Sequence, residues 1–268
     1  GKRDVAARYY QRAQNYRNSF DTKTGFLRAK KSDGQFREPF DPVRSNFGSD
    51  YTEGSAWQYS WYAPHDNAGL IKMLGGDAGL QSKIDMMFDA KVDDNVYAHM
   101  EDISGLIGHY AHGNEPSHHV AYLYNFAGAP WKTQQRLTQV VASQYNITPQ
   151  GLSGNDDLGQ MSAWLAFTAL GFYPVAPGSN EYVIGRPFLD KAVLNLPNGK
   201  TFTIRALGMG AGNHYVAGVS LNGKPLAQTF LRHEQIMAGG ELVFTMSAQP
   251  NKDWGKGAAA RPYTQTAY

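Results

Sequence analysis

The sequence predicts an α+β fold in which a helical region precedes a small antiparallel β region. From residue 4 to about residue 173, apolar side chains recur every three or four positions, which is typical of helices that bury one face. From about residue 182 onward, apolar and polar side chains alternate, which is typical of half-buried strands. Turn signals rich in Gly, Asn and Pro separate these later runs.

Apolar spacing predicts a first helix over residues 5–16. The same spacing predicts further helices over residues 53–62, 67–74, 80–88, 116–126, 131–143 and 161–172. Pro116 and Pro130 fit the first position of a helix, where a missing N–H costs nothing. Gly128 and Gly171 fit helix ends, which often need a left-handed residue.

The expected strands cover residues 182–184, 191–196, 202–206, 215–221 and 242–246. Residues 197–199 (Pro-Asn-Gly) and 222–225 (Asn-Gly-Lys-Pro) are turn signals between neighbouring strands. We therefore expect a helical, barrel-like portion over residues 1–178 and an antiparallel β-sandwich region over residues 179–250. The Gly- and Ala-rich residues 251–268 are expected to form a flexible tail or linker.

Composition narrows the functional classes. Apolar residues make up 42% of the 268 residues, which is enough for a core and argues against disorder. The net charge of +2 comes without a basic stripe, so nucleic acid is a poor candidate partner. There is no run of 18 apolar residues, so no membrane span is expected, and the absence of cysteine excludes thiol chemistry. The chain begins within a helical pattern and shows no signal peptide, which predicts an internal cut in a longer protein.

Three expected loop-to-helix junctions carry carboxylates: residues 50–59 with Glu53, residues 112–119 with Glu115, and residues 154–164 with Asp156 and Asp157. Each also has a purely structural explanation, as a first-turn acid favoured by the helix dipole or as an N-cap. One acid is enough for a cap, so the adjacent pair fits a cap and a functional site equally well. Three such junctions in one helical region favour a shared site.

Loops at one end of an α-helical barrel converge, so their carboxylates can face each other across a bond. Glycoside hydrolysis needs such a pair, one acid for the leaving oxygen and one base for water, about 6.5–9.5 Å apart in inverting enzymes. Trp57 beside Glu53 would exclude water and keep this acid protonated. The solvent-open Asp156 and Asp157 would stay ionised.

Other chemistries fit less well. Neither a G-x-S-x-G elbow nor a P-loop is present, and the Gly-rich residues 208–212 lack the strand-to-helix context of a dinucleotide site. His118 and His119 are adjacent, so they face different sides of a helix and do not chelate zinc together; they also fit satisfied core histidines. Oxygen-rich junctions are more compatible with a hard cation such as Ca²⁺.

Several ordered motifs resemble glycoside hydrolase family 92, the calcium-dependent exo-acting α-mannosidases. The matching stretches are residues 52–59 (TEGSAWQY), 64–66 (PHD), 113–125 (GNEPSHHVAYLYN), 129–134 (APWKTQ), 154–164 (GNDDLGQMSAW), 170–175 (LGFYPV), 182–185 (YVIG) and 221–226 (LNGKPL). They extend over roughly residues 4 to 250. The resemblance implies inverting hydrolysis of terminal α-linked mannose, most often α-1,2.

The resemblance also implies roles for individual residues. Glu53 corresponds to the family's general acid, and Asp157 is placed as the general base with Asp156 in support. Many relatives carry a further acid where this chain has Asn155, so a base function shared with that position is not expected here.

The family's calcium binds near the sugar, and the resemblance places it near Asn114 and Glu115. Trp57, Gln58, Glu115 and His118 are the expected contacts to the sugar or its linkage.

Family members are much longer, with an N-terminal β-sandwich and the first helices of an (α/α)6 barrel ahead of the matching region. The active site of the family lies between these parts, so the expected partners are α-mannoside glycans and that N-terminal portion. A non-catalytic mannose-binding or scaffold fragment is the alternative, and a phosphorylase ranks last because no basic phosphate pocket is evident. The family's substrates lead us to expect a periplasmic or secreted protein.

Overall fold

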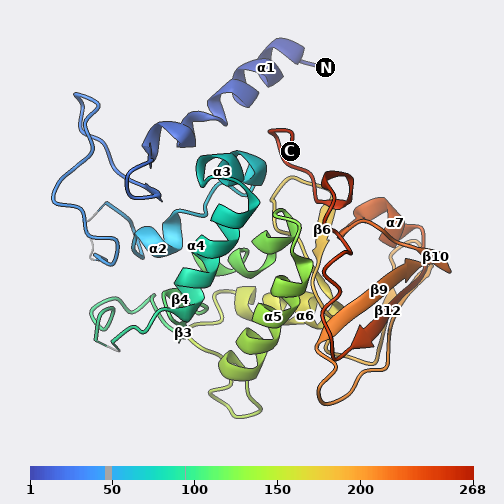
Figure 1. Ribbon diagram of the computed structural model, residues 1–268. Coiled ribbons are helices and arrows are strands. Elements are labelled where there is room, and N and C mark those ends of the chain that lie inside the picture. Colours follow the sequence, from blue (N-terminus) through green and yellow to red (C-terminus); the bar gives the residue numbers. More distant parts are fainter. Residues whose placement is uncertain (46–49, 94) are drawn as a thin grey trace.

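The computed structural model describes residues 1–45, 50–93 and 95–268 (Figure 1). Helices occupy one side of the molecule and the β9–β12 sheet the other, while α1 lies along the outer edge of the helical side. Each side has its own hydrophobic core, one of helix and loop side chains and one mainly of strand side chains. The predicted mixture of α and β structure is thus confirmed. The barrel, the sandwich and the boundaries at residues 178 and 250 stay predictions.

The longer helices agree with the sequence periodicity to within a few residues. They are α1 (Arg3–Arg12), α3 (Asn67–Met73), α4 (Asp77–Asp89), α5 (Pro130–Gln144) and α6 (Gln160–Leu170). α5 begins at its proline and α6 ends at Gly171, which has a φ of 96°. Both ends follow from backbone chemistry, since proline needs no N–H partner at a helix start and glycine accepts the left-handed region without strain.

Two predicted helices differ from the structure. The helix expected over 53–62 is only α2 (Ala56–Tyr59), because Ser55 caps it in a capping box with Gln58 and leaves Glu53 in the preceding loop. The helix expected over 116–126 is two 3₁₀ turns, η2 (Glu115–Ser117) and η3 (Val120–Asn125). Every side chain of η3 is buried, so this segment has no solvent face and its apolar periodicity was misleading.

The remaining short helices are η1 (Asn15–Ser19), α7 (His233–Met237) and η4 (Ala258–Ala260). Two small hairpins lie within the helical region, one formed by β1 (Phe20–Asp21) and β2 (Phe26–Leu27), the other by β3 (Leu106–Ile107) and β4 (Tyr110–Ala111).

The β region contains a five-stranded sheet of order β10-β9-β12-β8-β7 and a three-stranded sheet of order β11-β6-β5. The strands of the first sheet are β7 (Lys191–Asn195), β8 (Thr201–Leu207), β9 (Tyr215–Leu221), β10 (Lys224–Pro225) and β12 (Gly240–Ser247). Those of the second are β5 (Phe172–Tyr173), β6 (Glu181–Ile184) and β11 (Phe230–Arg232).

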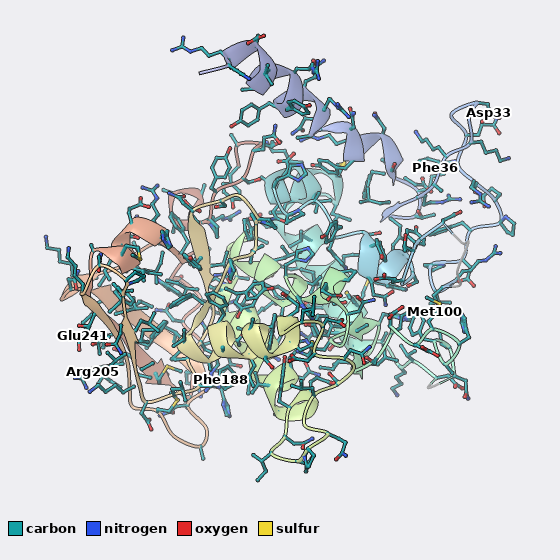
Figure 2. The ribbon with its side chains drawn as sticks, turned by 180° about the vertical axis from the view of Figure 1, so that it is seen from behind. Asp33, Phe36, Met100, Phe188, Arg205 and Glu241 are labelled. Carbon is teal, nitrogen blue, oxygen red and sulfur yellow. The ribbon has the colours of Figure 1, made fainter. Side chains whose placement is uncertain are left out.

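The prediction of a purely antiparallel β region is wrong. β12 pairs with β9 antiparallel but with β8 parallel, because the chain crosses over through β11 and α7 before it returns to the sheet. Along β8, Phe202, Ile204 and Ala206 alternate inward to the core. Arg205 points outward, where its Nε donates to Glu241 Oε1 on β12 at 2.6 Å (Figure 2).

Residues 251–268 do not extend as the free linker that was expected. They pack on the helical region, because the buried Asp66 carboxylate accepts hydrogen bonds from Thr264 Oγ1 and from the Thr266 backbone N–H and hydroxyl. Arg261 forms an ion pair with Asp77 at the start of α4, at 2.7 Å. These contacts are polar, so the apolar pattern of the sequence did not indicate that this segment packs on the rest of the chain.

Candidate active site

Glu53 lies in the loop before α2, half-buried. Its backbone N–H donates to the Tyr59 hydroxyl at 3.3 Å, and its carbonyl accepts from Asn114 Nδ2 at 3.3 Å. The capping box that starts α2 two residues later fixes where this loop ends. The second hydrogen bond joins the loop of Glu53 to the junction that carries Glu115.

Glu115 opens η2, directly before Pro116, and is half-buried. Burial raises the pKa of the Glu115 carboxyl, and the nearby charges of Asp157 and Glu53 raise it further. The effect of those two residues places all three carboxylates in one electrostatic neighbourhood. The structure therefore brings together one acid from each of the three junctions.

The adjacent acids at the third junction have separate roles. Asp156 Oδ1 accepts from the Ser162 backbone N–H and from the Ser162 hydroxyl, both at 2.9 Å, so Asp156 caps the first turn of α6. Asp157 caps no helix in the described part of the chain, has a φ of 45° and is exposed, and its charge acts on Glu115. Of the two explanations left open by the sequence, the cap applies to Asp156, and a catalytic function of Asp157 stays a prediction.

His118 is buried and hydrogen-bonded at both ring nitrogens. Nε2 pairs with the His112 carbonyl at 2.9 Å and Nδ1 pairs with Gln160 Nε2 at 3.1 Å. Burial lowers the pKa of His118 to about 4, so the ring is neutral at pH 7. His119 instead pairs with the Trp61 carbonyl at 2.9 Å, which agrees with the expectation that the two histidines do not chelate one metal.

Trp57 and Gln58 are engaged in the fold around the site. Gln58 Oε1 accepts from both the backbone N–H and the hydroxyl of Ser55 at 2.8 Å, and Nε2 donates to the His109 carbonyl at 2.6 Å. The Trp57 ring stacks on His109 with centroids 4.8 Å apart and meets Phe26 edge-on. Both side chains support the Glu53 loop, and a contact of either with a sugar stays a prediction.

A cavity of about 190 Å³ opens beside these junctions. Glu115, His118 and Gln160 form its polar part. The rest of the lining consists of Tyr62, Pro64, His119, Tyr173, Pro174, Val175 and Pro177. This volume lies below the roughly 300–1,000 Å³ of pockets that enclose drug-sized ligands.

Sequence reasoning did not select Tyr62 or Tyr173 as site residues, whereas Gln160, beside the acid pair, was expected in a polar pocket. Gln160 Nε2 also donates to the Tyr173 hydroxyl at 3.3 Å, so these two close one side of the cavity. The signal was present, because Gln160 and Tyr173 both lie in stretches that carried the family resemblance. What periodicity could not show is that the residues after α6 fold back beside η2.

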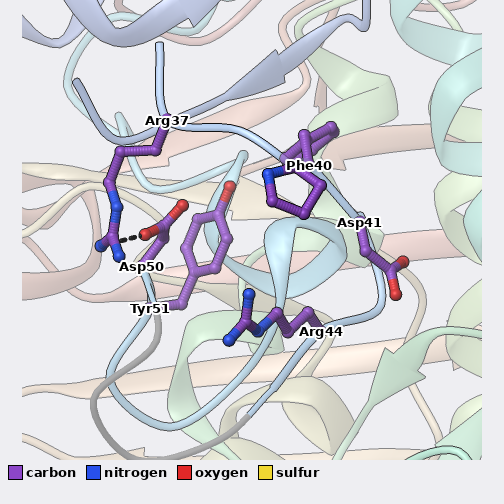
Figure 3. A pocket seen from close by; sticks show the side chains of 7 residues that line it. Arg37, Phe40, Asp41, Arg44, Asp50 and Tyr51 are labelled. Carbon is purple, nitrogen blue, oxygen red and sulfur yellow. Dashed lines mark ion pairs between the residues drawn. The ribbon is translucent and has the colours of Figure 1, made fainter. Parts of the chain in front are cut away.

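A separate small pocket lies in the segment that leads into the Glu53 loop. Figure 3 shows Arg37, Phe40, Asp41, Arg44 and Tyr51 around it, with Arg37 Nη1 paired to Asp50 Oδ1 at 2.5 Å. Its volume of about 30 Å³ holds little more than a water molecule. This pocket is therefore not a sugar site.

The calcium expectation finds only partial support in the geometry. Asn114 donates through Nδ2, which leaves its Oδ1 available, and Glu115 adds carboxylate oxygens. Calcium takes six to eight oxygen ligands. Within residues 1–45, 50–93 and 95–268, no group of three or more His, Cys, Asp or Glu side chains could hold a metal ion. In the same ranges no helix combines the length and apolarity needed to cross a membrane.

The family model for the glycosyl hydrolase family 92 catalytic domain matches residues 1–248. The chain belongs to glycosyl hydrolase family 92. Among solved family 92 structures, the α-mannosidase BT3965 from Bacteroides thetaiotaomicron, in complex with mannoimidazole, is 40% identical with a TM-score of 0.93 and is matched over 98% of this chain. The inverting mannosidase BT2199 from the same organism is 39% identical with a TM-score of 0.88, over 99% of this chain.

An uncharacterised secreted glycosidase of Arthroderma benhamiae is 30% identical over 93% of this family 92 chain. The match covers 33% of that protein, and the two bacterial mannosidases are covered to 35% and 37%. The chain thus spans about a third of the length of these relatives.

Proposed function

We propose that this chain supplies the carboxylate-bearing part of the active site of an inverting α-mannosidase that removes terminal α-linked mannose. The observation that carries the proposal is that Glu115 lines one small cavity and has its pKa raised by the nearby charges of Asp157 and Glu53, so that an acid from each junction acts at the same place. Family 92 membership supports it, as does the likeness to two bacterial mannosidases, one of them described as inverting.

In the proposed mechanism, Glu53 protonates the leaving oxygen and Asp157 accepts a proton from the attacking water. Asp157 is suited to act as the base because its side chain is exposed to water. The helix is capped by Asp156, so Asp157 is not needed for that bond. The pKa of the Glu115 carboxyl is raised, so this group can hold a proton between itself and Asp157 or Glu53 when sugar hydroxyls replace water in the cavity. Neutral His118 holds Gln160 at the edge of the cavity through Nδ1 without adding charge.

The finer parts of the proposal concern the complete protein. We propose that the complete protein prefers α-1,2 linkages. We also propose that the helical region belongs to an (α/α)6 barrel and that the β region forms a sandwich. The missing contacts would come from an N-terminal β-sandwich portion. The fungal relative described as secreted supports a secreted or periplasmic location.

Calcium assistance is also proposed for the complete protein. Asn114 and Glu115 offer oxygen donors of the right chemistry, but too few for a full coordination shell. A bound calcium would orient sugar oxygens and balance the negative charge of the site.

The second candidate function is mannose binding or scaffolding without turnover. It is favoured by the share of the relatives that the chain covers, about a third, since the other two thirds of those proteins have no counterpart in this chain. Mannose binding by this chain with no released product would support it, whereas hydrolysis by the pure chain would exclude it.

The deciding experiment is Glu53→Gln in the complete protein. We expect turnover of α-1,2-mannobiose to fall about 10²–10⁴-fold, the usual contribution of a general acid. An aryl mannoside with an acidic leaving group needs no protonation and should lose much less activity. Asp157→Asn should slow both substrates alike, and the exposed Glu101→Gln is the matched control. Unchanged disaccharide turnover in Glu53→Gln would contradict the assignment.

A further inference from the structure

The loops of Glu115 and Asp157 meet at a junction of small residues. Gly113 donates its N–H to the Ser104 carbonyl at 3.1 Å, and a Cβ on Gly113 would overlap Ser104 Oγ. A Cβ on Gly154 would lie 2.6 Å from the same Ser104 Oγ and 3.1 Å from the Gly113 carbonyl oxygen. The Ser104 hydroxyl therefore occupies the space that a side chain at either glycine would need.

Hydrogen bonding does not explain why Ser104 is there. Its buried Oγ has no hydrogen-bond partner in the described ranges, and the same is true of Ser153 Oγ next to Gly154. A Cβ on Gly105 would come within 2.5 Å of Ser153 Oγ, so the second serine also works as a spacer of defined size. Close-packed contacts of this kind transmit small displacements from one loop to the other, because a protein interior has no empty space into which the atoms could move.

The junction lies at the base of the two acid loops. Glu115 is two residues after Gly113, and Asp157 is three residues after Gly154. We propose that Ser104 is a positioning residue whose side chain, held between Gly113 and Gly154, sets the separation of the Glu115 and Asp157 carboxylates. The value of that spacing for catalysis rests on the proposed function, but the spacing itself can be tested without substrate.

Gly113→Ala in this chain is the first test. Gly113 does not have a positive φ, so alanine fits the backbone and acts mainly through the clash with Ser104, since the next atom, the Ser153 carbonyl oxygen, would be 3.0 Å away. The clash should move the loops apart, so the separation of the Glu115 and Asp157 carboxylates should increase. Crystal structures of the parent and of Gly113→Ala, solved under the same conditions, measure this separation.

Rescue separates positioning from general damage. Ser104→Ala removes the clashing hydroxyl, so adding it to Gly113→Ala should restore most of the original carboxylate separation. Gly210→Ala is the control, since nothing lies within 4 Å of a Cβ there. If Gly113→Ala folds and keeps the separation of the parent, or if the double variant fails to restore it, the proposal is wrong.

If Gly113→Ala does not fold, Ser104→Ala alone decides the question. It removes the atom on which both glycines pack, so the two loops are no longer held at one spacing and the separation of the Glu115 and Asp157 carboxylates should change. An unchanged separation would overturn the proposal. A changed separation combined with normal mannoside turnover of Ser104→Ala in the complete protein would keep the positioning role but contradict the proposed catalytic site.

Discussion

Asp156 and Asp157 are adjacent, yet their carboxylates have different surroundings. Asp156 turns back on α6 to cap it, while the left-handed backbone at Asp157 and Leu158 turns the next carboxylate outward. Sequence alone could show that one acid of the pair suffices for a cap. It could not show which one, because that choice depends on the dihedral angles of Asp157 and Leu158, where no glycine signals a positive φ.

This division predicts unequal losses of stability for two neighbouring substitutions. Asp156→Ala should destabilise the chain by about 1 kcal/mol, the usual loss for a helix cap. Asp157→Asn should change stability by less than about 0.5 kcal/mol, since asparagine accepts the left-handed region and the side chain caps nothing. Urea denaturation at pH 7 measures both. Equal losses for the two variants would show that the cap is shared.

At the scale of elements, the predictions that succeeded were those with a local cause. α5 and α6 were found because a proline and a glycine mark one end of each. η2 and η3 were predicted as one α-helix because a segment buried on all sides has apolar residues at the same spacing as a buried helix face. The attachment of residues 251–268 was missed because it depends on Asp66, which is distant in sequence.

Asp66 connects three segments of the chain. Its carboxylate accepts from Tyr16 at 2.8 Å, from Arg17 at 3.0 Å and from Thr266. Burial alone would raise the pKa of Asp66, but these hydrogen bonds outweigh it and hold the pKa far below its usual range. A carboxyl with a depressed pKa stabilises the fold above its unfolded-state pKa, and that contribution is lost as the pH falls.

Asp66→Asn should therefore destabilise the chain at pH 7 by about 2–4 kcal/mol, since hydrogen bonds to a charged group contribute about 1.5–3 kcal/mol. The difference from the parent should shrink as the pH falls below the ordinary value of 3.8. Urea denaturation between pH 7 and pH 2.5 follows it. Thr266→Val, which removes only one donor, is the control and should lose about 1 kcal/mol. A difference that does not depend on pH would contradict this account.

At the scale of the whole molecule, the helical core and the β core are in contact. Phe244 on β12 is fully buried, and its ring lies against the end of α6, where a Cβ on Gly171 would be 2.8 Å from Phe244 Cζ. The sequence predicted both regions and most strands, but not this contact or the parallel pairing of β8 and β12. Long-range pairings leave no mark on local periodicity.

The contact predicts that both regions unfold together. Phe244→Ala should cost about 3–5 kcal/mol, as for other large core truncations. Circular dichroism follows the loss of helix, and tryptophan fluorescence follows side-chain packing in the helical region and at Trp254. Coincident transitions in parent and variant would agree with one cooperative unit. A variant in which the helical signal keeps the parent midpoint would show that the regions unfold separately.

The hydrogen bonds of Asp66 to residues near both termini have a further consequence for the two ends of this chain. Gln265 Nε2 donates to the Tyr10 carbonyl on α1, and Arg17 Nη2 donates to Thr266 Oγ1 at 2.7 Å. α1 itself buries no side chain. Proteolytic trimming of the last few residues would thus remove a contact of the first helix and leave Asp66 with only its Tyr16 and Arg17 partners, so a cut at one terminus would loosen the other.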